Sequence, residues 1–135
     1  METQFITVTI EQPYDEVYRF LADPLNFPSW GPVQGTEIHH LHGSDWLVEI
    51  NGGPMILRFS SPNLDGILDY WMFGPGQAVG DVIPVRLTHL GEACQVTLTW
   101  QRPAGVSDEL YASQLEVARY YLTRLKNLLE SEPGN

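Results

Sequence analysis

The stretch Ser107–Glu130 is the feature that most constrains how this chain can fold. At about 1.5 Å per residue, an α-helix over these positions would be roughly 36 Å long, enough to cross a small domain. Ser107 is a good N-cap, acidic residues follow it, and Pro133 stands where a helix has to stop. The apolar residues recur every three or four positions and therefore share one helix face: Leu110, Tyr111, Leu115, Ala118, Leu122, Leu125 and Leu129.

The residues before this helix predict an antiparallel sheet. Phe5–Ile10 is a β-branched run typical of a first strand. Segments rich in Gly, Asn, Asp and Pro, which favour hairpins, separate six further predicted strands. Pro84 lies within the sixth strand of the chain and predicts a β-bulge there, because proline cannot donate to a strand ladder. The six strands are Thr36–Leu41, Trp46–Asn51, Met55–Ser60, Ile67–Phe73, Val79–Leu90 and Ala93–Gln101.

Two short helices are predicted between the first two strands. Pro13 can begin a helix whose apolar residues continue to about Ala22, and Leu25–Trp30 is typical of a second helical turn. The order is therefore strand, two short helices, six antiparallel strands and a long helix, which predicts an α+β fold in one domain over residues 1–135. The long helix has to cover the apolar face of the sheet.

The net charge and the cysteine content limit the partners that the chain can bind and the cellular compartment that it suits. The formal net charge of −10 repels nucleic-acid phosphates and anionic lipid surfaces, and no segment approaches the apolar length of a membrane span. One cysteine excludes an intrachain disulfide, and the first residues lack the pattern of a signal peptide. We therefore expect a cytoplasmic protein, as a monomer or a homodimer.

Several stretches resemble one family. They are Ile10–Pro24 with Trp30 shortly after, Gly66–Tyr70, Pro103–Asp108 and the helix end Leu125–Glu130. Together with the element order, they resemble the START-like or SRPBCC superfamily, and within it the small bacterial polyketide cyclase/dehydrase-type proteins. The resemblance implies a helix-grip fold, in which a curved seven-stranded antiparallel sheet carries the long helix across its concave face. Members of this superfamily range from binders of apolar ligands to cyclases, with no shared catalytic set.

This resemblance implies three functions. The first is binding of a small apolar or amphipathic molecule between the long helix and the sheet, without a cofactor. The second is a cyclase- or dehydratase-like enzyme that uses polar groups in the same cavity. The third is a protein-binding module of the chaperone-activator type, with an exposed aromatic patch such as Trp46 and Trp71.

The concave face is expected to be apolar with a few polar tips, the usual composition of a small-molecule site. Ile83 and Val96 are expected on this face, and Tyr121 is expected to add a hydroxyl. The residues predicted to bind the ligand are Trp71, Phe73, Val85, Leu87, Leu98, Trp100, Tyr111, Leu115, Ala118 and Leu122.

Asp69 is the candidate catalytic residue, because it interrupts an otherwise apolar strand. If it points inward, it is a carboxylate with a raised pKa and an acid/base role, partnered by Arg58 or Arg86. If it points outward, or forms a buried ion pair, it is structural. Both faces of the strand are apolar, so alternation leaves both alternatives open. Arg58, Arg86 and Glu49 all lie among apolar residues, and alternation predicts that the two arginines project from the outer face.

Histidines and the cysteine complete the candidates. On a strand, His40 and His42 would share a face while His39 points the other way. His40 and His42 could bind a metal if His89 or an acid supplied a third ligand, but nothing in the sequence fixes that ligand. We therefore predict a solvated hairpin and no metal. Cys94 alternates in phase with a core stripe and is predicted to be a buried neutral thiol.

Overall fold

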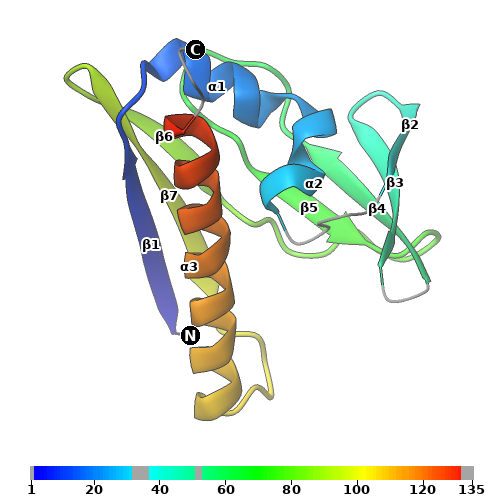
Figure 1. The fold of residues 1–135 in the computed structure, drawn as a ribbon. Coiled ribbons are helices and arrows are strands. Elements are labelled where there is room, and N and C mark those ends of the chain that lie inside the picture. Colours follow the sequence, from blue (N-terminus) through cyan, green and yellow to red (C-terminus); the bar gives the residue numbers. More distant parts are fainter. Residues whose placement is uncertain (1, 32–36, 51–52, 132–135) are drawn as a thin grey trace.

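The computed structural model describes residues 2–31, 37–50 and 53–131 (Figure 1). Thr36, Asn51 and Pro133, which entered the predictions above, lie outside these ranges. The predicted element order is confirmed. The elements are β1 (Thr3–Ile10), α1 (Tyr14–Ala22), η1 (Pro24–Asn26), α2 (Phe27–Trp30), β2 (Ile38–His42), β3 (Asp45–Ile50), β4 (Gly53–Phe59), β5 (Tyr70–Phe73), β6 (Val85–Leu90), β7 (Ala93–Gln101) and α3 (Asp108–Glu130).

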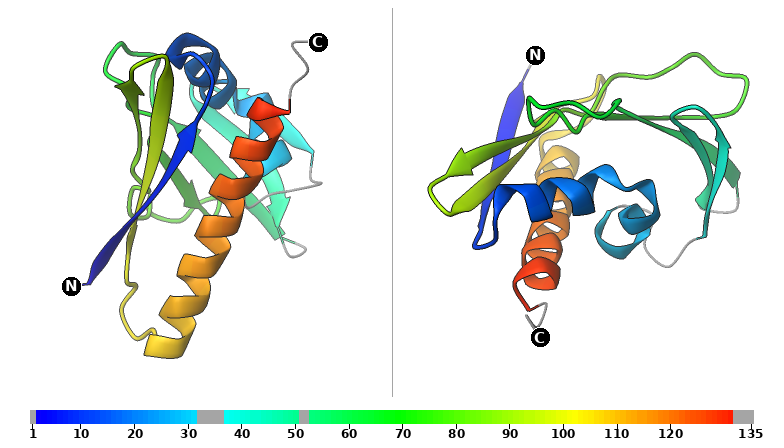
Figure 2. Two further views of the ribbon diagram at one scale, coloured as in Figure 1. Left: turned by 60° about the vertical axis from the view of Figure 1, so that its left-hand side comes forward. Right: turned by 90° about the horizontal axis from the view of Figure 1, so that it is seen from above.

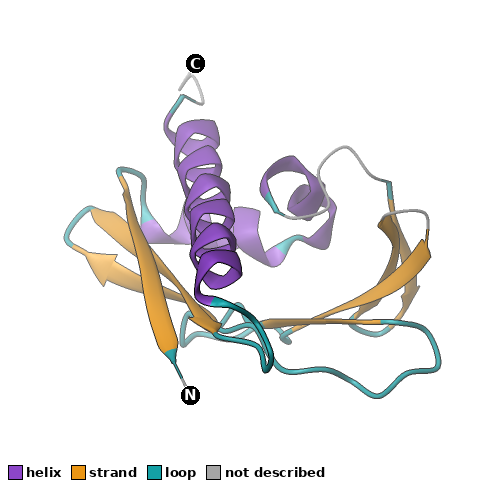
Figure 3. Cartoon of the chain, turned by 90° about the horizontal axis from the view of Figure 1, so that it is seen from below, coloured by secondary structure: helices purple, strands orange, loops and turns teal. Residues whose placement is uncertain are grey.

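The seven strands are divided between two antiparallel sheets. One has the order β1-β7-β6 and the other the order β2-β3-β4-β5. Two isolated bridges, Ile67 with Arg86 and Tyr70 with Ile83, join them. Figure 3 shows the strands curving around the side on which α3 lies, so the predicted α+β helix-grip fold is confirmed.

Two strand predictions were too long. Regular pairing in the sixth strand begins at Val85, directly after Pro84, and the predicted bulge inside it is therefore wrong. The carbonyl of Pro84 still accepts a hydrogen bond from the Thr99 amide at 3.0 Å. The fifth strand begins at Tyr70, and Ile67 contributes only a bridge.

Helix α3 is seated on the first sheet, as Figure 2 shows. The Ser107 side chain caps it by accepting from the Leu110 amide at 3.1 Å. Its inward face buries four residues against β1 and β7, and apolar burial of this kind is what stabilises an amphipathic helix. These residues are Tyr111, Ala118, Leu122 and Leu125.

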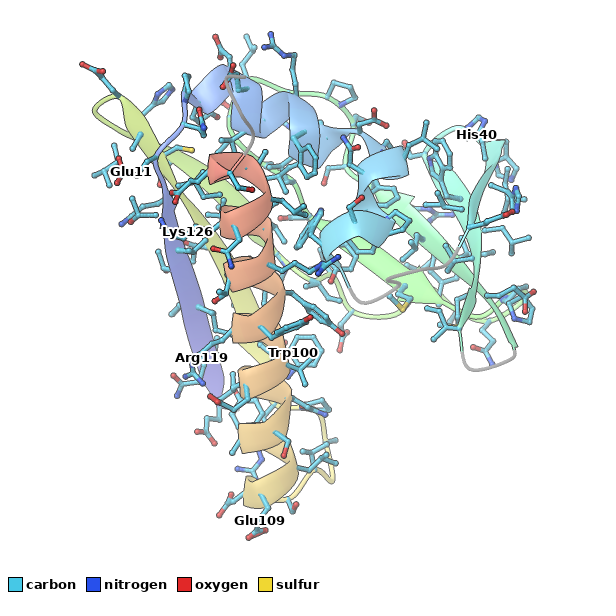
Figure 4. All side chains as sticks on the ribbon, in the orientation of Figure 1. Glu11, His40, Trp100, Glu109, Arg119 and Lys126 are labelled. Carbon is cyan, nitrogen blue, oxygen red and sulfur yellow. The ribbon has the colours of Figure 1, made fainter. Side chains whose placement is uncertain are left out.

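The C-terminal end of α3 is tied to the end of β1. Lys126 Nζ donates to the Thr9 carbonyl and to Glu130 Oε2, both at 2.6 Å. The same Glu130 oxygen accepts from the Glu11 amide at 2.7 Å. Figure 4 shows Glu11 and Lys126 close to each other at this end. These hydrogen bonds, that of Lys126 first, lower the pKa of Glu130.

Arg102 ties the N-terminal end of α3. Its Nε and Nη2 donate to the Val106 carbonyl at 3.0 and 2.7 Å. Its Nη1 lies 2.6 Å from Asp108 Oδ1 and 3.1 Å from Glu2 Oε1. The guanidinium also stacks over the Tyr111 ring, with 5.6 Å from Cζ to the ring centroid. Both ends of α3 are therefore fixed by charged hydrogen bonds.

The short helices close one side of the core. Phe27 contacts Trp30, Phe59 and Tyr70 in edge-to-face geometry, with ring centroids 5.0 to 5.5 Å apart. Arg124 on α3 donates to the Ser29 carbonyl at 2.7 Å and links α2 to α3.

Over the described ranges, no helix combines the length and apolar character needed to cross a membrane.

Candidate functional site

A cavity of about 390 Å³ lies between α3 and the strands β5 and β7. It exists because α3 packs along β1 and β7, whereas the sheet that holds β5 curves away from it (Figures 1 and 3). The volume is within the range of small-molecule sites. We call this hollow the α3 cavity. Its lining residues are Tyr70, Met72, Ile83, Leu98, Trp100, Leu110, Ser113, Gln114, Val117, Ala118 and Tyr121.

The lining is apolar apart from a few neutral polar groups. Trp100 Nε1 donates to Gln114 Oε1 at 2.9 Å, which joins β7 to α3 across one wall. Figure 4 shows Trp100 beside α3, on the side that faces β5. Burial is the first cause that raises the pKa of both Tyr70 and Tyr121, so both phenols stay protonated at neutral pH. Among the described residues of the lining there is no Asp, Glu, His, Lys, Arg or Cys.

Three of the predicted ligand-binding residues line the α3 cavity: Leu98, Trp100 and Ala118. The lining also includes Ile83 and Tyr121, which the sequence placed on this face.

Five further predicted binding residues belong to the core. Val85, Leu87 and Leu122 are 1 to 2% exposed and belong to the hydrophobic core. Leu115 packs against the same core. Tyr111 donates its hydroxyl proton to the Trp100 carbonyl at 2.9 Å and faces Arg102.

Trp71 and Phe73 lie on the opposite face of β5, which corrects the expectation that they face the cavity. Tyr70 and Met72 line the cavity, and alternation places Trp71 and the buried Phe73 on the other face of the strand. Trp71 pairs with Arg58, whose guanidinium lies 5.1 Å from the Phe73 ring centroid. All four residues of β5 are apolar, so their sequence pattern favoured neither face.

The lining residues that sequence reasoning missed come mainly from α3. Leu110, Gln114 and Val117, with the anticipated Tyr121, recur at helical spacing and form a second stripe beside the core stripe. Leu110 was assigned to the core stripe, but it is 50% exposed and borders the cavity. The spacing of this second stripe could have predicted the cavity wall, but the polar residues Gln114 and Ser113 interrupt its apolar pattern.

A second hollow of about 390 Å³ lies behind Ile83 and Trp100, which border both spaces. Its wall includes the exposed residue Asp81 and the side chain of Arg102. Arg102 already donates to the Val106 carbonyl and pairs with two acids, so it has little capacity left for an anionic ligand. The α3 cavity is therefore the better candidate.

Asp69, the candidate catalytic residue, does not line the α3 cavity. Its Oδ1 accepts from the Val85 amide at 2.9 Å and from Arg86 Nη1. The Asp69 side chain is 13% exposed and that of Arg86 is 45% exposed. Of the alternatives left open by the sequence, the ion pair with Arg86 is the one observed, and it ties β6 to the segment before β5.

Arg58 pairs with Asp45 and not with Asp69. The Arg58 Nε and Nη2 donate to the two carboxylate oxygens of Asp45 at 2.6 and 2.9 Å. These hydrogen bonds lower the pKa of Asp45, whose whole residue is 6% exposed. The bidentate pair joins β3 to β4 on the face opposite the cavity lining.

The histidines do not converge. The His40 ring lies over Trp46, with 4.8 Å between centroids, and its Nε2 is 3.0 Å from the Gly43 carbonyl oxygen. A register shift between His40 and His42 breaks the simple alternation assumed for them. His89 stacks on Tyr14 at 3.8 Å, on another part of the fold. Across the described ranges, no cluster of three or more His, Cys, Asp or Glu side chains could hold a metal ion.

Cys94 is 0% exposed, as predicted, and burial raises the pKa of its thiol. Its Sγ lies 3.7 Å from the Gln12 carbonyl oxygen. It fills the core between β1 and α1, away from the cavity lining.

Neither a protein-family model nor a curated protein sequence matches the chain. Solved structures do match it. The Aha1 dimer from Colwellia psychrerythraea is 17% identical, with a TM-score of 0.71 and coverage of 96% of this chain and 97% of that chain. An uncharacterised protein from Bacillus thuringiensis is 14% identical, with a TM-score of 0.73 and coverage of 95% and 98%. Ara h 8.0201 is 14% identical, with a TM-score of 0.62 and coverage of 97% and 99%. This likeness establishes the fold. At such identities it carries no further conclusion.

Proposed function

We propose that this protein binds a small, largely apolar molecule in the α3 cavity. The observation that carries the proposal is the cavity itself, about 390 Å³ with an apolar lining and a few neutral hydrogen-bonding groups. The hollow opens to solvent beside Leu110 and Val117, which are about half exposed, so a molecule can enter it. The sequence supplies large side chains throughout this region, yet α3 and β5 stay apart.

The lining favours binding over acid–base catalysis. A general acid or base must titrate near the working pH and reach the reacting atom. The described lining holds two phenols whose pKa values burial raises, and no carboxylate or imidazole. Asp69, which the enzyme alternative needed, is instead bound to Arg86 and the Val85 amide.

The protein-binding alternative receives less support from the aromatic residues. It required a filled cavity and an exposed patch that includes Trp46 and Trp71. Both tryptophans are half-buried, Trp46 beneath His40 and Trp71 opposite Arg58.

We propose a small-molecule binder in the cytoplasm, as a monomer or a homodimer, with one domain over residues 1–135.

A pair of matched variants tests the proposal. Ala118 lines the cavity and is 7% exposed, whereas Ala112 is exposed on the same helix and does not border it. Ala118→Leu adds bulk inside the cavity, and Ala112→Leu adds the same bulk outside at little cost in helix propensity.

The measurement is a thermal-shift panel of neutral polycyclic and acyl compounds, run beside nucleotides and sugar phosphates. We expect the apolar compounds to raise the melting temperature of the wild type and of Ala112→Leu, increasingly with concentration. Ala118→Leu should respond much less. A rise with the phosphates alone, or an equal response of the two variants, would refute the proposal. Native mass spectrometry of protein purified from its source should show a retained small molecule.

A further inference from the structure

We infer that the α3 cavity takes a neutral molecule with an acceptor oxygen, of the ketone, quinone or ester type, which the Tyr70 hydroxyl and the Gln114 amide recognise. This inference rests on the proposed function, because it specifies the chemistry of the molecule bound there. Three features of the lining support it: the orientation of one amide, the burial of one phenol and the absence of charge.

The Gln114 amide is oriented by Trp100. An indole N–H can only donate, so the oxygen of the amide must face it, as the 2.9 Å Nε1–Oε1 distance shows. The NH₂ group of the same amide then points away from Trp100. In the part of the chain that the structure describes, no protein acceptor receives a hydrogen bond from this group. Gln114 thus presents N–H donors on the cavity wall.

Tyr70 supplies the second donor from the opposite wall. The residue is only 6% exposed, and its ring is held against Phe27 with 5.0 Å between centroids. Within residues 2–31, 37–50 and 53–131, its hydroxyl has no hydrogen-bond partner. A buried hydroxyl without a partner costs free energy, so a bound molecule that accepts from it removes that cost. Tyr121 adds another phenol from α3, and its nearness contributes to the raised pKa of Tyr70.

The charge of the lining selects against acids. A carboxylate or phosphate in this cavity would lose its hydration, and the described lining offers no Lys, Arg or His to compensate. A neutral carbonyl oxygen is much cheaper to bury, and its two lone pairs can accept from two donors. The donors therefore fit a neutral acceptor and not an anion.

Three compounds on one carbon skeleton separate these effects: tetralin, α-tetralone and tetralin carboxylate. The first has no acceptor, the second has a ketone and the third has a charge. Dissociation constants come from NMR titrations of the isotope-labelled protein, in which shifted resonances also locate the site. Tyr70→Phe removes the phenol donor. Gln114→Glu replaces the amide N–H donors with a carboxylate, which keeps an oxygen for Trp100 and adds a negative charge to the lining. Tyr121→Phe removes the second phenol of the lining. Tyr120→Phe is its matched control, because Tyr120 is 54% exposed and does not border the α3 cavity.

We expect α-tetralone to bind about threefold to tenfold more tightly than tetralin, the range that one or two net hydrogen bonds provide. The carboxylate should bind more weakly than both. Tyr70→Phe and Gln114→Glu should each remove most of the ketone's advantage and leave tetralin affinity within about twofold, whereas Tyr120→Phe should change neither.

If tetralin and α-tetralone bind equally well in the wild type, or the carboxylate binds best, the inference is wrong and the proposed function stands. If Tyr70→Phe and Gln114→Glu both keep the ketone preference, the inference is also wrong, because the acceptor is then recognised elsewhere. If neither neutral compound binds or shifts cavity resonances, the proposed function fails and the inference fails with it.

Discussion

Replacing Leu122 with alanine measures how firmly α3 is seated on the first sheet. Leu122 is 1% exposed and lies on the inward face of α3, between Ala118 and Leu125. It packs in the core and does not border the α3 cavity. Leucine and alanine have similar helix propensities, so the substitution reports packing. Because α3 is tied at both ends and cannot collapse freely onto the sheet, we expect a loss of about 3–5 kcal/mol, the upper part of the range for buried leucines.

The assay is urea unfolding followed by circular dichroism. An unchanged m-value would show that the two proteins expose similar surface on unfolding. Leu110→Ala is the matched control, because Leu110 lies on the same helix and is 50% exposed at the cavity edge. It should cost about 1 kcal/mol or less, since half of its side chain is already in water. If the two variants lose similar stability, or Leu122→Ala loses under about 1 kcal/mol, the assignment of Leu122 to the core is wrong.

Three other perturbations follow from the same structure. The Arg58 hydrogen bonds lower the pKa of Asp45 in the folded protein. The pair therefore stabilises the fold at pH values above the unfolded-state pKa of Asp45, and this stabilisation is lost as the pH falls through its folded-state pKa. Asp45→Asn should therefore flatten the acid side of a curve of stability against pH, and an unchanged slope would contradict this. Lys126→Met should lower the free energy of unfolding in urea by about 1–2 kcal/mol, because it removes the hydrogen bond to the Thr9 carbonyl. Arg119→Met removes only an exposed ion pair and should lower it by less than about 0.5 kcal/mol. Equal losses of stability would contradict the role of Lys126 in tying α3 to β1. A chelator should leave the melting temperature unchanged, and metal analysis should find no stoichiometric zinc or iron. Stoichiometric metal that is lost on replacing His40 or His42 would overturn this prediction.

The parts of the fold that the sequence predicted well are those in which several signals agree. For α3, the spacing of apolar residues, the Ser107 cap and the acidic first turn all indicate the same start, and the helix begins at Asp108. For β7, alternation of polar and apolar residues predicted Ala93–Gln101, which is the observed strand. Alternation also placed Cys94 in the core correctly.

The parts that the sequence did not predict depend on contacts between distant residues. In Val79–Leu90, the β-branched residues favour a strand, but Pro84 has no N–H to donate and the regular ladder starts at Val85. In β5, four apolar residues in a row gave no indication of which face Trp71 would occupy. Asp45 follows a Gly-Ser pair typical of a turn, and its burial depends on Arg58 from the next strand. The cavity itself is a space between elements, which residue patterns do not encode.

The attachment of α3 at both ends has a mechanical consequence. Arg102 holds one end of the helix, and Lys126 and Glu130 hold the other. Outward movement of either end would therefore break hydrogen bonds made by charged side chains. The opposite wall is joined differently. In the described ranges the two sheets meet through two isolated bridges between the β5 and β6 regions, through the backbone hydrogen bonds of these bridges and through the Asp69–Arg86 ion pair. For the proposed binding, the consequence is that α3 supplies a wall of fixed position, so a molecule in the α3 cavity has to fit the distance that these end contacts set between α3 and β5.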